Sequence, residues 1–418
     1  MSWRWVRHAW KDGEAAMNLP RGKAPAAGFV EDEGWRGESA RVLLNRHELA
    51  GAFGDLGTDL PLLLGMILAA GLHASSVLIV FGCLQIVTGL WYRLPMPVQP
   101  LKAMAAIVIA QGVTPGVLYG GGLAVGCLML ILAVTGSLDA LVRWLPKSVV
   151  RGVQLGVGLQ LATVALTKFV QADGRVGYAL AAAAFVLVLA LIGNRRVPAA
   201  LPVVVLGALY AAMFGPERVT LLRGFGLVLP EPRAVSVADI VAGAFLLALP
   251  QLPLSIANSV VATRQLVEDL FPERRLTARQ IGFTYALMNL VAPWLGGVPV
   301  CHGSGGLAGH YAFGGRTGGS VVLYGAVFLF AGLLWGVGFE QLARSFPLPV
   351  LGILLLFEAL ALMSRIGDVA GDLPSLFTTL LVGVLCSSLP YGYVLGMIVG
   401  TAVTRLGWHD TWVQSSHR

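Results

Sequence analysis

Residues 296–319 read "GGVPVCHGSGGLAGHYAFGGRTGG", and ten of these 24 residues are glycine. Long apolar stretches flank the segment on both sides, so hydropathy places it within a membrane region. Glycine is among the poorest helix formers, and backbone groups buried in lipid must have hydrogen-bond partners. The segment therefore predicts an interrupted membrane segment, whose backbone does more than cross the bilayer.

Composition indicates an integral membrane protein. Of the 418 residues, 56% are hydrophobic and 12% are charged, and the mean hydropathy is +0.76. Soluble domains carry about 25% charged residues. The net charge of +7 comes mainly from short loops and the first 46 residues, which is the pattern of membrane topology and not of nucleic-acid binding. We therefore predict a chain that lies in a lipid bilayer and has no nucleic-acid partner.

Apolar runs predict about fourteen membrane segments in an all-α protein, most of them near the length that crosses a bilayer. Two of them are shorter and rich in Gly or Pro, and we predict that these two, the third and the tenth, are half-helices. The predicted segments are 49–70, 74–92, 98–111, 117–138, 148–168, 177–193, 198–214, 238–262, 279–295, 302–313, 319–339, 347–364, 373–388 and 390–405.

The Arg and Lys residues predict the orientation of the chain. Loops on the side of the N-terminus hold fourteen of them and the opposite loops hold six, and cytoplasmic loops carry such an excess. We therefore predict a multi-pass protein of the inner or plasma membrane with both termini in the cytoplasm. The predicted parts are a cytoplasmic N-terminal tail (1–46), a first seven-segment repeat (47–214), a linker (215–237), a second seven-segment repeat (238–405) and a short C-terminal tail (406–418).

The two halves of the chain resemble each other in sequence. The first segment contains "GDLGTDLPLLLG" and the eighth contains "LPQLPLSIANSV", and both place "LPL" beside small polar residues. The third segment opens with "LPMPVQPLKAMAA" and the tenth with "GGVPVCHGSGGLAG", and both place "PV" just before a short helix. An odd number of segments in each half makes the repeats inverted, and paired interrupted segments of this kind predict the binding site of a transporter.

The starts of the two half-helices predict an anion site. A helix that begins in mid-membrane leaves its first N–H groups without partners, and an anion satisfies them while its charge is favoured by the helix dipole. The extended "PVQP" ends before Leu101, and "PVCHG" ends before Ser304. Gly303, Gly305 and Gly306 allow close approach to the backbone, and we predict Ser304 as the N-cap.

Lys102 predicts the charge of the ligand. It follows "PVQP" within an apolar run, and a charge near the membrane centre is a functional site by default. Its charge and two helix starts, at roughly +0.5 each, give a field of about +2, which matches a compact divalent oxyanion. Alternatively, Lys102 extends to the membrane surface or pairs with Asp55 or Asp59.

Other polar residues of the first, third, eighth and tenth segments are predicted to surround the anion. Their alternative role is hydrogen bonding between helices, which is common in membrane bundles. The full set of predicted substrate-binding residues is Asp55, Thr58, Gln99, Lys102, Gln251, Asn258, His302, Gly303, Ser304, Gly305 and Gly306.

Three acidic residues are candidates for proton coupling. Asp55 and Asp59 lie in the first segment, and Glu358 stands alone in the twelfth. Burial and a facing anion both disfavour an ionised carboxylate, so a proton taken up with the anion lowers the repulsion, and we place it on Asp55 before Asp59. Alternatively, the two aspartates cap helices or pair with Lys102, and Glu358 faces a water-filled vestibule.

Enzymatic and metal-dependent functions are not predicted. Cys301 and His302 have no second ligand pair at zinc spacing, so we expect neither a metal nor a cofactor. The sequence shows no nucleophile with a base, as a membrane enzyme would need. It also contains no G-x-x-x-x-G-K-[ST] motif, so ATP is not expected to drive transport directly.

Three motifs resemble the molybdate transporter family related to sulfate permeases. They are "PMPVQPLKAMAA", "QLPLSIANSVVAT" followed by "DLFP", and "PVCHGSGGLAGHYAFGGRTG", together with the opening "GDLGTDLPL". The resemblance covers residues 46–405. It implies the seven-plus-seven inverted repeat shared with sulfate and uracil permeases, in which a core domain holds the substrate between half-helices three and ten and a gate domain packs beside it. A homodimer is a candidate assembly.

The predicted function is therefore secondary active transport of molybdate, with tungstate and sulfate as further candidate substrates and a proton as the candidate coupling ion. One alternative is a permease for sulfate or another oxyanion. Another is a passive anion channel on the same fold, which would not respond to collapse of the proton gradient.

Overall fold

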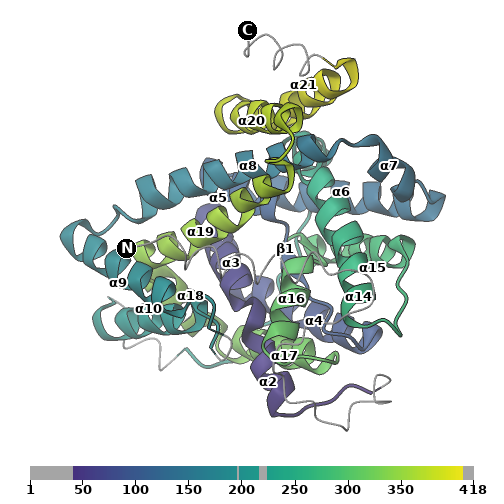
Figure 1. The fold of residues 1–418 in the computed structure, drawn as a ribbon. Helices are drawn as coiled ribbons and strands as arrows, with labels where there is room; N and C mark the ends of the chain where they lie inside the picture. Colours follow the sequence, from purple (N-terminus) through teal and green to yellow (C-terminus); the bar gives the residue numbers. More distant parts are fainter. Residues whose placement is uncertain (1–40, 195–196, 216–223, 408–418) are drawn as a thin grey trace.

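The computed structural model describes residues 41–194, 197–215 and 224–407 (Figure 1). Most of the predicted N-terminal tail, residues 216–223 of the predicted linker and nearly all of the predicted C-terminal tail lie outside these residues. The predicted domain boundaries remain predictions.

The first half of the described chain contains a helix in each of the seven predicted segments, with one additional short helix, α7, between the fourth and the fifth. Pro115 begins α6, where its missing N–H leaves no bond unmade. The elements are α2 (Arg46–Ala52), η1 (Phe53–Asp55), α3 (Leu56–Ala70), α4 (Ala74–Tyr92), β1 (Gln99–Pro100), α5 (Lys102–Gln111), α6 (Pro115–Thr135), α7 (Leu138–Trp144), α8 (Lys147–Val164), η2 (Ala165–Phe169), α9 (Gly174–Leu191) and α10 (Ala200–Phe214).

The second half also contains a helix in each predicted segment. The eighth continues to Leu270, beyond the predicted end at residue 262, and α17 and α18 meet at an angle of 98°. The elements are α12 (Val237–Gly243), η3 (Ala244–Ala248), α13 (Leu249–Leu254), η4 (Ser255–Ala262), α14 (Thr263–Leu270), α15 (Ala278–Val291), η5 (Ala292–Leu295), β2 (Val300–Cys301), α16 (Ser304–Ala312), α17 (Gly319–Leu334), α18 (Gly336–Ser345), α19 (Leu348–Met363), η6 (Ser364–Val369), α20 (Leu373–Ser388) and α21 (Gly392–Leu406).

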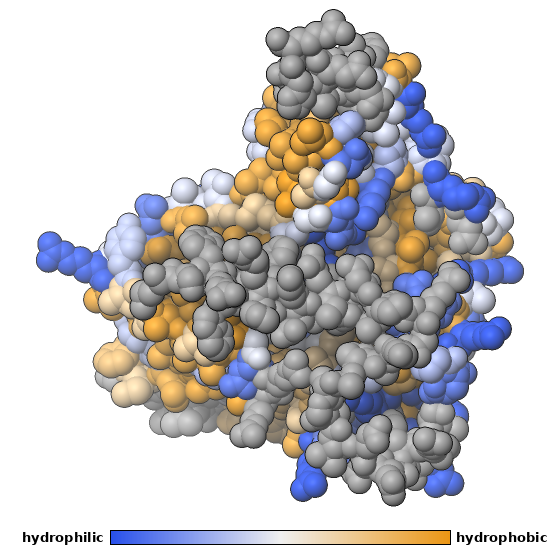
Figure 2. All heavy atoms as spheres, viewed as in Figure 1, coloured by the Kyte–Doolittle hydropathy of each residue, from blue (hydrophilic) through white to orange (hydrophobic). Residues whose placement is uncertain are grey.

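Exposed apolar side chains confirm a membrane protein. Within the described residues, seven helices are long and apolar enough to cross a membrane, or eight if the bent α17–α18 pair counts as one span. Large apolar residues such as Val186 and Leu189 on α9 and Leu209 and Phe214 on α10 are exposed. Figure 2 shows hydrophobic residues gathered on the left, where α9 and α10 lie in Figure 1, and near the top beside α20 and α21. Apolar surface on this scale fits contact with lipid.

Helix pairing follows the predicted inverted repeat. In one group of helices α4 packs against α17, and α6 packs against α15 and α12. In the other, α8 packs against α19 and α20, and α9 packs against α19 (Figure 1). The second segment, α4, packs against the eleventh, α17. The equivalent segments in the other half are the ninth, α15, and the fourth, α6, and these two also pack together, as a two-fold relation between the halves requires.

Glycine allows the closest of these contacts. A Cβ atom placed on Gly82 of α4 would lie 2.6 Å from the carbonyl oxygen of Gly325 of α17, and one placed on Gly325 would lie 2.6 Å from that of Gly82. Small residues at membrane helix interfaces let backbones approach closely and gain van der Waals contact. The α4–α17 interface therefore depends on glycine in both helices.

Candidate anion-binding site

The two extended stretches before the short helices α5 and α16 pair with each other in the interior of the molecule. Strand β1 runs antiparallel to β2, with Gln99 opposite Cys301 and Pro100 opposite Val300. The Leu101 N–H continues the pairing by donating to the Pro299 carbonyl at 3.0 Å. Each interrupted segment thus satisfies part of the other's backbone, as burial in lipid demands.

Two side-chain amides complete this backbone in the same way in both halves. In the first half, Gln85 of α4 accepts from the Val98 N–H at 3.1 Å and donates to the Val98 carbonyl at 2.8 Å. In the second half, Asn289 of α15 accepts from the Val300 N–H at 2.9 Å and donates to the Val300 carbonyl at 2.7 Å. Val98 and Val300 are the valines of the two "PV" motifs. Sequence analysis missed both amides, although each is a polar residue in an apolar segment.

The start of α5 carries a side-chain cap. Its N-cap residue is Leu101, and the Gln251 Oε1 atom accepts from the Ala103 N–H at 2.9 Å and the Met104 N–H at 3.4 Å. The Gln251 Nε2 atom in turn donates to the Ser255 hydroxyl at 3.1 Å. Two N–H groups that were expected to be free for an anion therefore already have a partner.

The start of α16 is different. Its N-cap residue is Gly303, so the prediction of Ser304 as the N-cap is wrong. Ser304 is the first helical residue, and its hydroxyl donates to the Asn258 Oδ1 atom at 2.8 Å. A Cβ atom placed on Gly305 would meet no atom within 4 Å. The first turn of α16 therefore faces open space at Gly305.

A cavity of about 180 Å³ lies between these two helix starts. It has room for several waters, since each occupies roughly 30 Å³, and so for a small polyatomic ion. Six of the predicted binding residues line it, and so do two of the three predicted proton-coupling residues, Asp55 and Glu358. The lining residues are Gly54, Asp55, Thr58, Lys102, Gln154, Gln251, Leu254, Asn258, Ser259, Cys301, Gly305, Glu358, Ala361, Leu362 and Arg365.

His302 does not line this cavity, contrary to expectation. Its ring is fully buried. Its Nδ1 atom lies 3.0 Å from the Pro97 carbonyl oxygen, and its Nε2 atom lies 2.9 Å from the Thr284 hydroxyl. Both ring nitrogens therefore have partners within the protein, and the ring links the segment after β2 to the segment before β1.

Four other predicted binding residues are not part of the cavity lining, namely Gln99, Gly303, Ser304 and Gly306. The Gln99 Nε2 atom donates to Asp55 Oδ1 at 2.7 Å. A Cβ atom on Gly303 would collide with the Gln99 side chain, and one on Gly306 would collide with the Asp55 carboxylate. These two glycines bring α16 close to Gln99 and Asp55.

Lys102 and Glu358 form an ion pair in the cavity wall. The Lys102 Nζ atom lies 2.6 Å from Glu358 Oε1, and the two side chains are 16% and 6% exposed. The Thr58 hydroxyl donates to Glu358 Oε2 at 3.2 Å. Glu358, the only charged residue of the twelfth segment, therefore pairs with the third segment, and the partner of Lys102 is neither Asp55 nor Asp59. The predicted charge of about +2 at the site did not include the Glu358 carboxylate, which contacts the lysine directly.

The two aspartates are buried next to each other. Asp55 lines the cavity, and Asp59 lies one helical turn further along α3, on the same helix face. Asp59 has the Asp55 carboxyl and the Tyr324 hydroxyl beside it. The site thus combines one lysine with three carboxyl groups.

Among the cavity residues that were not predicted from the sequence, two have long polar side chains. Gln154 lies on α8 and Arg365 follows the end of α19. Gln154 stands between glycines in the apolar "RGVQLGVG", which is a detectable signal, whereas Arg365 was counted only as a loop cation. Within the parts of the chain that the structure describes, no three His, Cys, Asp or Glu side chains gather closely enough to hold a metal ion.

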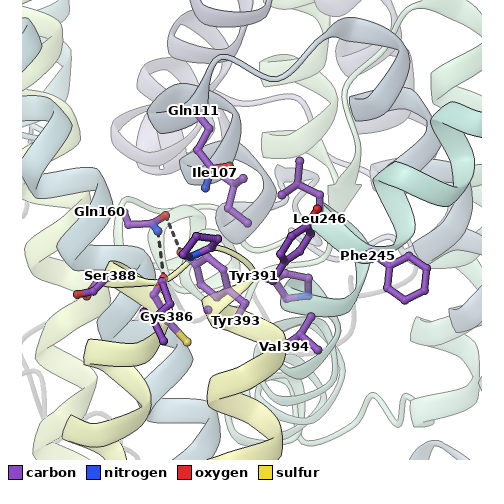
Figure 3. A pocket seen from close by; sticks show the side chains of 15 residues that line it. Ile107, Gln111, Gln160, Phe245, Leu246, Cys386, Ser388, Tyr391, Tyr393 and Val394 are labelled. Atoms are coloured by element: carbon purple, nitrogen blue, oxygen red, sulfur yellow. Dashed lines mark hydrogen bonds between the residues drawn. The ribbon is translucent and has the colours of Figure 1, made fainter.

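A second cavity, of about 440 Å³, lies beyond the C-terminal end of α5 (Figure 3). Its lining includes Ile107, Gln111, Gln160 and Tyr391, and it contains no charged residue. Gln160 accepts from the Tyr393 hydroxyl at 2.8 Å and donates to the Cys386 carbonyl at 3.1 Å (Figure 3). Without a cation in its wall, this cavity is a poorer match for a dianion than the one at Lys102.

Known structures share this fold. The murine Slc26a9 anion transporter in the inward-facing state has a TM-score of 0.66 at 14% identity, covering 97% of this chain and 75% of that chain. The transmembrane domain of the cyanobacterial bicarbonate transporter BicA has a TM-score of 0.61 at 15% identity, covering 85% of this chain and 96% of that chain. The all-α membrane fold with two inverted seven-segment repeats is thus confirmed, while the exact number of spans stays a prediction.

Sequence relatives identify the family. The family model described as "Molybdate transporter of MFS superfamily" matches residues 47–161 and 243–362. Molybdate transporter 2 of Arabidopsis thaliana is 34% identical over 412 residues, covering 84% of this chain and 86% of that protein. Molybdate transporter 1 of Chlamydomonas reinhardtii is 31% identical over 433 residues, covering 76% and 83%. The chain therefore belongs to the molybdate transporter family.

Proposed function

We propose that this protein is a secondary active transporter that binds molybdate between the starts of α5 and α16. The observation that carries the proposal is the cavity, which is lined by both Lys102 and Gly305, where the backbone faces open space. Tungstate and sulfate have the same tetrahedral shape and charge and are further candidate substrates. The protein acts in the inner or plasma membrane with both termini in the cytoplasm, and a homodimer is the candidate assembly.

Each part of the cavity has a role in holding the anion. Lys102 supplies a full positive charge, and hydrogen bonds between charged partners are about twice as strong as neutral ones. The first turn of α16 supplies backbone N–H groups and the positive end of a helix dipole. Thr58 and Asn258 line the cavity as neutral polar residues. The Asn258 amide nitrogen can donate a hydrogen bond to the anion, and the Thr58 hydroxyl can do so when it is released from Glu358.

Accumulation of a dianion in a negative-inside cell needs a driving ion or a very low free concentration of the anion inside. The cost is about 2.3 kcal/mol per charge for each 100 mV. The carboxyl groups of Asp55, Asp59 and Glu358 lie in or next to the cavity, and each repels the substrate when ionised. A proton that enters with the anion removes one such repulsion, and its release inside the cell completes symport.

Molybdate uptake into proteoliposomes with imposed pH gradients tests the proposal. An inward proton gradient should accelerate wild-type uptake, and a protonophore should abolish accumulation. Uptake that ignores the proton gradient and never exceeds equilibrium would instead indicate a passive anion channel. Binding assays with molybdate, tungstate and sulfate decide the substrate, and tighter binding of sulfate would indicate a sulfate permease.

A further inference from the structure

The Lys102–Glu358 pair connects two parts of the molecule that are far apart in sequence. Lys102 is the first residue of the half-helix α5, and Glu358 lies on α19, which packs against α8, α9 and α3. Ion pairs buried in this way are seldom a net source of stability, because both charges lose their hydration. The position of this pair in the wall of a cavity therefore points to a use other than stability.

The Glu358 carboxylate occupies donors that an anionic substrate needs. One carboxylate oxygen accepts a hydrogen bond from the Lys102 ammonium at 2.6 Å, and the other accepts one from the Thr58 hydroxyl at 3.2 Å. Both donors line the cavity, as does Glu358 itself. A carboxylate on these two donors has the same sign and the same planar arrangement of oxygen acceptors as one edge of a tetrahedral oxyanion.

We propose that Glu358 is an internal anion that holds Lys102 while the cavity is empty, and that the substrate replaces it as Glu358 takes up one proton. The inference rests on the proposed function and adds the identity of the proton-binding group. No covalent bond changes. The proton adds to a Glu358 carboxylate oxygen when the oxyanion takes the ammonium, and it leaves when the oxyanion departs and the ion pair forms again.

The surrounding charges favour this exchange over simple displacement. Asp55 from η1 lines the cavity and accepts a hydrogen bond from Gln99, which does not line it, and Asp59 from α3 lies beside Asp55. A displaced Glu358 carboxylate would add a further negative charge near these acids and the substrate. The other ionisable groups of the cavity wall are Cys301 of β2 and Arg365 of η6, while α8 contributes the neutral Gln154.

The sum of the charges on the dianion, Lys102, Glu358 and the two helix starts supports one proton per anion. A dianion on Lys102 leaves a charge of −1, and two helix starts at roughly +0.5 each bring the sum near zero. An ionised Glu358 would return the sum of these charges to −1 in a buried site. Neutralisation of a buried group is the usual outcome when its charge has no partner.

The test is molybdate binding to purified protein at about pH 6 and about pH 8. For wild type, affinity should fall as pH rises, by up to about tenfold per pH unit for one linked proton. Glu358→Gln should bind at least as tightly as wild type at the lower pH and should lose this dependence. Glu340→Gln is the matched control, because Glu340 forms a 2.8 Å pair with Arg344 on α18 away from the cavity, and it should follow wild type.

Other outcomes separate this inference from the proposed function. If Lys102→Ala abolishes binding but Glu358→Gln keeps the wild-type pH dependence, the site stands and the role of Glu358 is wrong. If the pattern appears with sulfate and not with molybdate, the role of Glu358 stands and the substrate is wrong. If Glu358→Gln does not fold, Glu358→Asp should bind more tightly at about pH 8, because a shorter side chain reaches Lys102 less well, and weaker binding by this variant would overturn the proposal.

Discussion

The starts of α5 and α16 hold matching places in the two halves but differ in their chemistry. The α5 start carries a charged first residue, Lys102, and its next N–H groups bond to Gln251. The α16 start has glycine at its N-cap and open space at Gly305. One start therefore offers a side-chain charge and the other offers its backbone. An inverted repeat gives both halves the same chain path, and in the proposed site the two helix starts hold the anion by different groups.

The largest effect is expected at the charged start. Lys102→Ala should weaken molybdate binding by at least about 30-fold, because loss of one partner from a buried charge pair costs about 2–5 kcal/mol. Calorimetric titration of monodisperse protein measures the change. Lys147→Ala is the control, since Lys147 is an exposed lysine at the start of α8. Near-wild-type affinity in folded Lys102→Ala protein would remove the lysine from the site.

The shared backbone of the two starts is tested by the paired amides. Gln85→Leu and Asn289→Leu should each lower the melting temperature by a similar amount, because each leaves a buried N–H and a buried C=O without a partner, at about 1–3 kcal/mol per group. Gln265→Leu, which removes a surface amide from α14, should have little effect. A large loss in one variant and none in the other would show that the two halves do not support their extended segments in the same way.

The open start is tested by adding bulk. Gly305→Val should weaken molybdate binding about tenfold or more, because a hydrogen bond to a charged group contributes about 1.5–3 kcal/mol and the side chain would fill the space above the backbone. Gly371→Val is matched, since a Cβ atom there also meets no atom within 4 Å. Normal transport by Gly305→Val protein would place the anion elsewhere.

A smaller effect is expected at the capped start. Gln251→Leu should lower stability by about 1 kcal/mol, as loss of a helix cap does, and should change molybdate affinity less than Gly305→Val does. Thermal unfolding and titration of the same preparations measure both. If Gln251→Leu weakened binding more than Gly305→Val, the division of roles between the two starts would be reversed.

Much of the fold could be predicted from sequence because the signals are local. Apolar runs and the Gly- and Pro-rich breaks at 98–111 and 302–313 are read directly from neighbouring residues, and both segments contain the predicted short helix. The "PV" motif that occurs in both halves likewise indicated two equivalent extended segments. These features depend on chain composition within about twenty residues, and they gave the correct arrangement.

The contacts in the site could not be predicted because they join distant segments. Lys102 and Glu358 are 256 residues apart, and nothing in either segment indicates that α19 faces α5. His302 lies next to the half-helix start, which suggested a ligand, but its ring turns toward Pro97 and Thr284. Ser304 has the chemistry of an N-cap, yet the helix begins one residue earlier at Gly303, and the hydroxyl bonds to Asn258 instead.

Locating the molybdenum or tungsten atom of the bound oxyanion tests the proposed binding site most directly. Molybdenum and tungsten scatter strongly, so anomalous diffraction or cryo-electron microscopy of protein with molybdate or tungstate can place the anion. We expect density between the Lys102 ammonium and the backbone of Gly305, with the Glu358 carboxyl moved away from Lys102. Density in the uncharged cavity beside Gln160 and Tyr391, with the Lys102–Glu358 pair intact, would contradict this expectation.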